Sequence, residues 1–270
     1  MLQLNVYGPL RVCVDDRAVI DEHFRRRRAK ALFVLLYLER DRFMPRDELL
    51  ERLWPSGDEP PRDSGRLKQT AHVLRRALEA GQSRRTGWHY IVEHEGSYLF
   101  NARLPHDSDL AQVQVQLGRA DHARARGDID AALISYHRAF ILRRTGLLPE
   151  FRYEDWAAPF VIAEHEAYLE ALDAAARLHA ARQEYSLAID LMKHARREDP
   201  LRESSVLLLM ESLWRSDQPA AAIRTYSQFR DVLARSLQLE PDPKLAALNR
   251  TIRRGRAMDP DDERHLSAAS

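Results

Sequence analysis

The sequence predicts an α+β domain followed by an all-α domain, within a chain of 270 residues. Two observations lead to this fold class. In the first 105 residues, segments with the two-residue alternation of β-strands flank segments with helical periodicity. From Asp107 onward the apolar pattern is helical. A hydrophobic content of 44% is enough for each part to bury a core.

The front part contains strands, three helices and a hairpin, in that order. We expect strands at 2–6 and 10–14, helices over 29–38, 45–54 and 63–79, and paired strands at 90–93 and 98–100. Pro45 fits the first turn of its helix, where Asp47 and Glu48 suit the helix dipole. Three prolines and a glycine in residues 55–62 predict a loop, after which Asp63 or Ser64 can cap the third helix.

The back part shows an internal repeat. Helices are expected over 107–126 and 128–143, then over 156–182 and in further pairs to about residue 255, with a disordered tail at 259–270. At a spacing of 34 residues, Ala188 matches Ala222 and Leu172 matches Val206. This is the period of tetratricopeptide helix–turn–helix repeats. We therefore predict a winged helix-turn-helix domain at 1–105 and a tetratricopeptide-like helical-repeat domain at 106–258.

The winged-helix prediction depends on the third helix. At 100° per residue its apolar stripe consists of Leu67, Ala71, Leu74 and Leu78. The opposite face and its flanks carry polar and basic side chains, with Val73: Arg66, Lys68, Gln69, His72, Arg75 and Arg76. Glutamine and lysine can read base edges in a major groove, and arginine can hold phosphates. A solvated charged face is the alternative for such a helix taken alone.

Charge adds modest support for nucleic acid as a partner. Residues 1–105 hold 19 Lys and Arg against 15 Asp and Glu, whereas residues 106–270 hold 23 against 26. The densest basic cluster, at 25–30, lies where the dipole of the first helix disfavours cations, which suggests phosphate contact. A solvated or salt-bridged surface is the alternative.

Signals for other functions are weak. The sequence has no phosphate-binding loop, dinucleotide fingerprint, nucleophile elbow or zinc-protease motif, so we expect no enzyme activity and no cofactor. Cys13 is the single cysteine and is expected in the core, and His165 beside Glu164 and Glu166 does not form a metal site, because adjacent helix positions point apart. The aromatics Tyr153, Trp156, Phe160 and Tyr168 are expected in the core. Without a secretory signal or an apolar run of ~18 residues, we expect a cytoplasmic protein that does not contact membranes.

Several segments, taken in order, resemble the SARP family of antibiotic-regulatory transcription activators. In the front part they are residues 6–10 (VYGPL), 46–54 (RDELLERLW) and 74–78 (LRRAL). In the back part they are 147–149 (LLP), Trp156, 199–203 (DPLRE), 226–229 and 239–243 (LEPDP), which resemble that family's bacterial transcriptional activation domain.

The resemblance implies a sequence-specific activator with a winged helix of the response-regulator output type. Its partners would be double-stranded promoter DNA with tandem repeats, a second copy of the chain on that DNA, and RNA polymerase through its sigma or alpha subunit. By position, the residues facing bases would be Lys68, Gln69, His72 and Val73. Those facing phosphates would be Arg62, Ser64, Arg66, Arg75, Arg76, Arg84 and Arg85. The polymerase would contact the loop before the third helix, through Ser56, Asp58, Glu59 and Arg62.

The sequence departs from the family in two places. Relatives often carry arginine where this chain has Val73, although valine can contact a thymine methyl group. In the hairpin, Ser97-Tyr98-Leu99 stands where relatives usually read Gly-Tyr-Arg, so His94, Arg84 or Arg85 would replace that arginine. Two other functions stay open. The helical domain could sense a small molecule, such as a nucleotide second messenger, or the chain could be a helical-repeat scaffold for protein partners.

Overall fold

The computed structural model describes residues 1–19, 27–40, 42–54, 65–79 and 89–255. These residues form two compact units. Unit 1 combines residues 1–119 with 137–166, and unit 2 combines residues 120–136 with the chain from Ala167 on. Unit 1 therefore contains all described residues of the front part together with two segments of the predicted helical domain. The boundary between residues 105 and 106 stays a prediction from the sequence.

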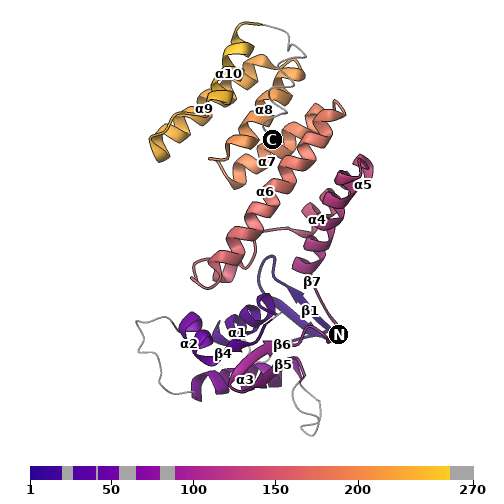
Figure 1. Cartoon of the computed structure of the whole chain (residues 1–270), viewed down its shortest axis with the longest axis vertical. Helices are drawn as coiled ribbons and strands as arrows, with labels where there is room; N and C mark the ends of the chain where they lie inside the picture. Colours follow the sequence, from indigo (N-terminus) through magenta and orange to yellow (C-terminus); the bar gives the residue numbers. More distant parts are fainter. Residues whose placement is uncertain (20–26, 41, 55–64, 80–88, 256–270) are drawn as a thin grey trace. The chain divides into compact units, whose positions relative to one another are not determined.

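A four-stranded sheet opens unit 1, with the strand order β3-β2-β1-β7. Its neighbouring strands β1 and β7 are labelled in Figure 1. Its strands are β1 (Leu2–Asn5), β2 (Arg11–Val14), β3 (Arg17–Ala18) and β7 (His106–Ser108). Strands β1 and β2 pair antiparallel, with Leu2 opposite Val14, whereas β1 and β7 pair parallel. The alternation of apolar residues puts Leu2 and Leu4 into the core, as expected.

Three helices and a second, three-stranded sheet follow. The helices are α1 (Arg27–Leu38), α2 (Arg46–Leu53) and α3 (Gly65–Leu78), and the strands are β4 (Met44–Pro45), β5 (Ile91–His94) and β6 (Ser97–Phe100). The strand order is β4-β6-β5, so the hairpin β5–β6 pairs with the short strand between α1 and α2. The expected order of strands, three helices and hairpin is confirmed, with helix ends shifted by one or two residues.

The core of unit 1 includes residues from both ends of its sequence. Helix α1 is buried almost throughout, and its Phe33 and Tyr37 pack edge-on against Phe100. The Tyr37 hydroxyl is 2.5 Å from Ser108 Oγ, and burial raises the pKa of Tyr37. Phe151 and Trp156, from the later helical segment, belong to the same core, with their ring centroids 5.3 Å apart. This later segment is therefore part of the fold of unit 1.

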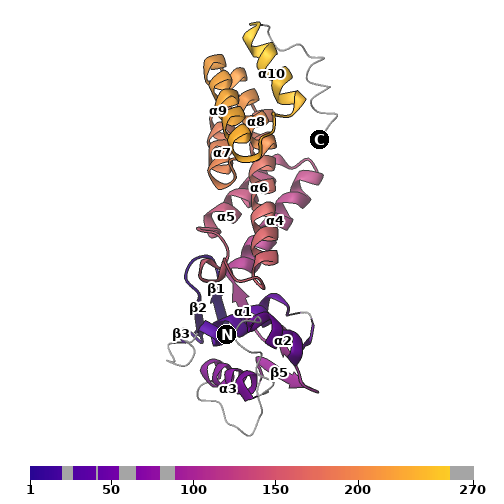
Figure 2. The ribbon, with the colours of Figure 1, turned by 90° about the vertical axis from the view of Figure 1, so that its left-hand side faces the viewer.

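The remaining helices follow one another with short connections (Figure 2). They are α4 (Asp109–Ala125), α5 (Ile129–Leu142), a 3-10 turn (Pro149–Phe151), α6 (Ala158–Ala181), α7 (Tyr185–Glu198), α8 (Glu203–Arg215), α9 (Pro219–Leu237) and α10 (Pro243–Arg253). Helices α4, α5 and α6 each contribute residues to both units. Gly127, with a positive φ of 75°, separates α4 from α5 at the expected place.

In unit 2, residues 34 positions apart occupy equivalent buried positions. Ala188 on α7 and Ala222 on α9 are both fully buried. Val206 on α8 is also fully buried, and Leu172 on α6 is 1% exposed. Neighbouring helices α7, α8, α9 and α10 pack against one another in sequence order. Residues that match at this spacing thus have equivalent burial in successive helix pairs.

Three expectations need correction. Residues 106–108 form strand β7, although Ser108 also caps α4 by accepting a hydrogen bond from the Ala111 amide at 2.9 Å. Tyr153 is 87% exposed, whereas Trp156 and Tyr168 are buried as expected and Phe160 is partly buried. Cys13 is only partly buried on β2. Pairing with β1 was not visible in residues 106–108 because the partner strand is about a hundred residues away.

Candidate nucleic-acid interface

The apolar stripe of α3 lies in the core of unit 1. Leu67, Ala71 and Leu74 are fully buried, and Leu78 is 1% exposed. Helix α3 packs on α1, whose Ala29, Leu32 and Phe33 belong to the buried residues of the unit. This packing fixes the rotation of α3 about its own axis and therefore decides which side chains face outward.

The outward face of α3 carries the predicted residues. Gln69, His72 and Arg76 are exposed, as are Arg66 and Lys68 on its edges, whereas Val73 is half-buried. Within the described residues, Arg66, Lys68 and Arg76 form no ion pair. Gln69 offers both an amide donor and an acceptor.

Arg75 contacts the hairpin, and its phosphate contact stays a prediction. Its Nε donates a hydrogen bond to the Ile91 carbonyl at 2.9 Å, and its Nη1 is 3.4 Å from the Glu93 carboxylate. The guanidinium also lies 5.7 Å from the centre of the Tyr98 ring, and the side chain is only 11% exposed. Arg75 thus joins α3 to the hairpin through its Nε and Nη1 atoms.

The hairpin is tied to α3 at a second point. The buried carboxylate of Glu79, just after α3, accepts hydrogen bonds from the His89 and Tyr90 amides, both at 2.8 Å. Glu95 and Gly96 form the hairpin turn with φ angles of 49° and 76°. Tyr98 is 1% exposed, and burial raises its pKa, so this residue of the wing motif belongs to the core. His94 is exposed at the end of β5.

Part of the predicted site falls outside the described residues. This applies to the whole predicted polymerase-contact loop and to part of the predicted phosphate-contact set: Ser56, Asp58, Glu59, Arg62, Ser64, Arg84 and Arg85.

The basic cluster at the start of α1 is paired with carboxylates in its described part. Arg27 Nη2 is 2.7 Å from Glu154, Arg28 Nη1 is 3.7 Å from the same carboxylate, and Lys30 Nζ is 3.0 Å from Glu150. Of the two interpretations of this cluster, these contacts favour the salt-bridged surface over phosphate contact. The pairing acids lie more than a hundred residues along the chain, so the sequence showed the cations without their partners.

The structure also brings together two of the segments that carried the family resemblance. In residues 6–10, the Val6 carbonyl accepts a hydrogen bond from the Leu148 amide at 3.0 Å, and Tyr7 forms a β-bridge with Leu147. The Leu10 amide donates to the Glu150 carboxylate at 2.8 Å. The first strand connection is therefore held by residues 147–150, a contact that no sequence pattern indicated.

Two further acidic residues hold this connection. Asp109 accepts hydrogen bonds from the backbone amides of Val6 and Tyr7, at 2.9 and 3.2 Å. Glu164 accepts from the Tyr7 hydroxyl at 3.0 Å and pairs with the buried Arg143 at 2.7 Å. Burial, followed by the charge of Glu164, raises the pKa of Tyr7. We call Asp109, Glu150, Glu154 and Glu164 the acidic clamp.

In the described part of the chain, no three His, Cys, Asp or Glu side chains gather as metal ligands would. None of the described helices combines the length and the apolar character needed to cross a membrane.

Comparison with known proteins supplies the family. The family profile "Bacterial transcriptional activator domain" matches residues 107–253. Regulatory protein AfsR of Streptomyces coelicolor is 27% identical over 252 residues, which cover 93% of this chain and 24% of AfsR. Transcriptional regulatory protein EmbR of Mycobacterium tuberculosis H37Rv is 27% identical over 274 residues, covering 99% of this chain and 67% of EmbR.

A solved structure of EmbR has a similar fold. The structure of Mycobacterium tuberculosis EmbR in complex with a low affinity phosphopeptide superimposes with a TM-score of 0.78 at 25% identity, over 99% of this chain and 69% of EmbR. The chain spans about a quarter of the length of AfsR and about two thirds of that of EmbR. With more than half of its residues matched by the family profile, the chain belongs to the bacterial transcriptional activator domain family, within the SARP-type transcription regulators.

Proposed function

We propose that the chain is a sequence-specific DNA-binding transcription activator without enzyme activity. The observation that carries this proposal is the outward face of α3, where Arg66, Lys68, Gln69, His72 and Arg76 are exposed while the opposite stripe is buried. The strands and helices around α3 have the order of a winged helix, in which such a helix enters the major groove and the hairpin lies beside it.

In this proposal the side chains of α3 have separate roles. Lys68, Gln69 and His72 face base edges, and the half-buried Val73 offers an apolar contact to a thymine methyl group. Arg66 and Arg76 hold phosphates and position the helix without reading the sequence. Arg75 instead holds the hairpin against α3, through its bonds to Ile91 and Glu93.

Residues 106–258 would act as a tetratricopeptide-like domain. We propose that two copies of the chain bind side by side on tandem promoter repeats. RNA polymerase would then be recruited through its sigma or alpha subunit, by the loop that contains Ser56, Asp58, Glu59 and Arg62. These partners rest on the family membership and on the sequence.

Capture of genomic fragments by the purified full-length protein tests the proposal first. We expect enrichment of a few promoters that share a tandem repeat, and a lower yield of these fragments with Arg76→Ala. Arg103→Ala is the matched control, because Arg103 is exposed outside α3 and should leave the enrichment unchanged. Uniform recovery of fragments by a folded wild-type protein would contradict sequence-specific binding.

Titrations on the recovered operator separate the two roles. Arg76→Ala should weaken binding to operator and random DNA alike and reduce the slope of log affinity against log salt by about 0.9. Gln69→Ala should relax specificity at one base pair, by about 1–3 kcal/mol for a bidentate contact. Equal losses on operator and random DNA for Gln69→Ala would refute the base-reading role.

A further inference from the structure

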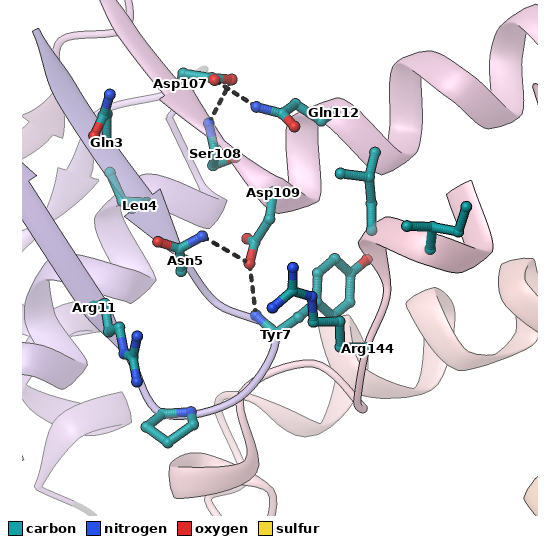
Figure 3. A pocket seen from close by; sticks show the side chains of 13 residues that line it. Gln3, Leu4, Asn5, Tyr7, Arg11, Asp107, Ser108, Asp109, Gln112 and Arg144 are labelled. Carbon is teal, nitrogen blue, oxygen red and sulfur yellow. Dashed lines mark hydrogen bonds between the residues drawn. The ribbon is translucent and has the colours of Figure 1, made fainter. Parts of the chain in front are cut away.

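A pocket of about 480 Å³ in unit 1 lies away from α3 (Figure 3). Its walls come from β1, the start of β2, the N-terminal end of α4 and the C-terminal end of α5. This volume is in the range of small-molecule sites. The pocket lies beside the acidic clamp, because Tyr7 and Asp109 line it.

The carboxylates of the pocket already have donors. Asp109 accepts hydrogen bonds from the amides of Val6, Tyr7 and Leu110, at 2.9 to 3.2 Å. Asp107 accepts from the Ser108 amide at 2.8 Å and from the Gln112 side chain at 2.5 Å. The Tyr7 hydroxyl donates to Glu164. These acidic and hydroxyl groups are therefore engaged within the protein.

Among the described residues, the two cations of the pocket have no partner. Arg11 is on β2 and Arg144 follows α5, and both side chains are exposed. Neither guanidinium forms an ion pair or a hydrogen bond with the described residues. In Figure 3, Arg11 and Arg144 come from opposite walls of the pocket. Each guanidinium presents five N–H donors in a planar fork, a geometry that matches carboxylate and phosphate oxygens.

We propose that this pocket binds a small metabolite through an oxyanion, a phosphate or a carboxylate group, held between Arg11 and Arg144. The charged side chains of the pocket that form no ion pair or hydrogen bond with the described residues are the two guanidinium groups, which only donate, so the complementary ligand offers acceptor oxygens and negative charge. Such a ligand would join β2 to the end of α5. The inference does not depend on DNA binding, since no α3 residue lines the pocket.

Calorimetric titration of the full-length protein tests the site, with pyrophosphate as the phosphate probe and citrate as the carboxylate probe, at matched ionic strength. We expect saturable binding of at least one probe, weakened about tenfold or more by Arg11→Gln and by Arg144→Gln. The probe that binds more tightly identifies the type of oxyanion. Because both arginines are exposed and form no ion pair with the described residues, these variants should keep the melting temperature of the probe-free wild type.

Two control variants locate the binding. Arg17→Gln replaces an exposed arginine on β3 of the same sheet, and Arg103→Gln replaces an exposed arginine after β6. Both should bind the probes as the wild type does. The proposal is overturned if neither probe binds, if the pocket variants bind normally, or if Arg17→Gln or Arg103→Gln weakens binding as much as the pocket variants do.

Discussion

Replacing Asp173 by asparagine should destabilise the protein strongly. Asp173 lies on α6 in unit 2 and is 3% exposed. Its carboxylate accepts hydrogen bonds from Ser204 Oγ at 2.7 Å, Ser205 Oγ at 2.8 Å and Arg202 Nε at 3.2 Å. These donors belong to the start of α8, so Asp173 also faces the positive end of that helix dipole. The segment 199–203 that carried part of the family resemblance is thus anchored by a buried carboxylate.

The magnitude follows from the number of bonds. A hydrogen bond to a charged group contributes about 1.5–3 kcal/mol, against about 1 kcal/mol between neutral groups. The asparagine keeps the volume but loses the charge for three bonds and turns one acceptor into a donor. We therefore expect a loss of about 2–4 kcal/mol, which corresponds to a melting temperature lower by roughly 8–16 °C at about 4 °C per kcal/mol.

Thermal and urea unfolding of the full-length protein measure this loss. Asp190→Asn is the control, because Asp190 is exposed on α7, and it should change the free energy of unfolding by less than about 0.5 kcal/mol. An Asp173→Asn variant as stable as the Asp190→Asn variant would refute the reasoning that this buried carboxylate anchors α8.

Three further predictions follow from unit 1. Arg42 holds the pKa of Glu39 and Glu48 below the ordinary value of 4.5, so Arg42→Gln should lower the free energy of unfolding by about 1 kcal/mol at pH 7. In urea unfolding at a series of pH values, this difference should vanish below pH 4.5, where acid protonates both carboxyl groups. A constant difference down to about pH 3 would contradict the prediction. A fragment of residues 1–105 should melt, by circular dichroism, well below unit 1 of the full chain, because it lacks the acidic clamp, Phe151 and Trp156; equal melting temperatures would contradict this. Gly96→Ala should lower the free energy of unfolding in urea by about 1–2 kcal/mol, because the φ of Gly96 is 76°. Gly118→Ala inside α4 should leave this free energy unchanged or raise it, and equal effects of the two changes would contradict the prediction.

The face of α3 could be predicted from the sequence because helical periodicity is a local property. Four apolar residues spaced by three or four positions define the buried stripe, and the exposed set follows by geometry. The contacts of Arg75 with the hairpin could not be predicted in this way. Its position on the helix surface placed it beside solvent, but the packed hairpin covers that side with Ile91, Glu93 and Tyr98.

The role of the basic cluster on α1 could not be predicted from its charges alone. Four arginines and a lysine in residues 25–30 are visible in the sequence, but their electrostatic meaning depends on which acids lie nearby. Glu150 and Glu154 lie in and just after the 3-10 turn that follows α5, and the fold brings them next to this cluster. Only the tertiary structure could therefore decide between a phosphate contact and a salt-bridged surface.

By itself the sequence determined the helices, the first two strands, the hairpin, the buried stripe of α3 and the resemblance to the family, because these depend on spacing between near neighbours along the chain. Only the tertiary structure decided that residues 137–166 belong to the compact unit of the first three helices. It also decided the parallel strand β7, the acidic clamp and the pocket between Arg11 and Arg144. Each of these joins residues about a hundred or more positions apart, and such contacts are set by packing and burial rather than by local pattern.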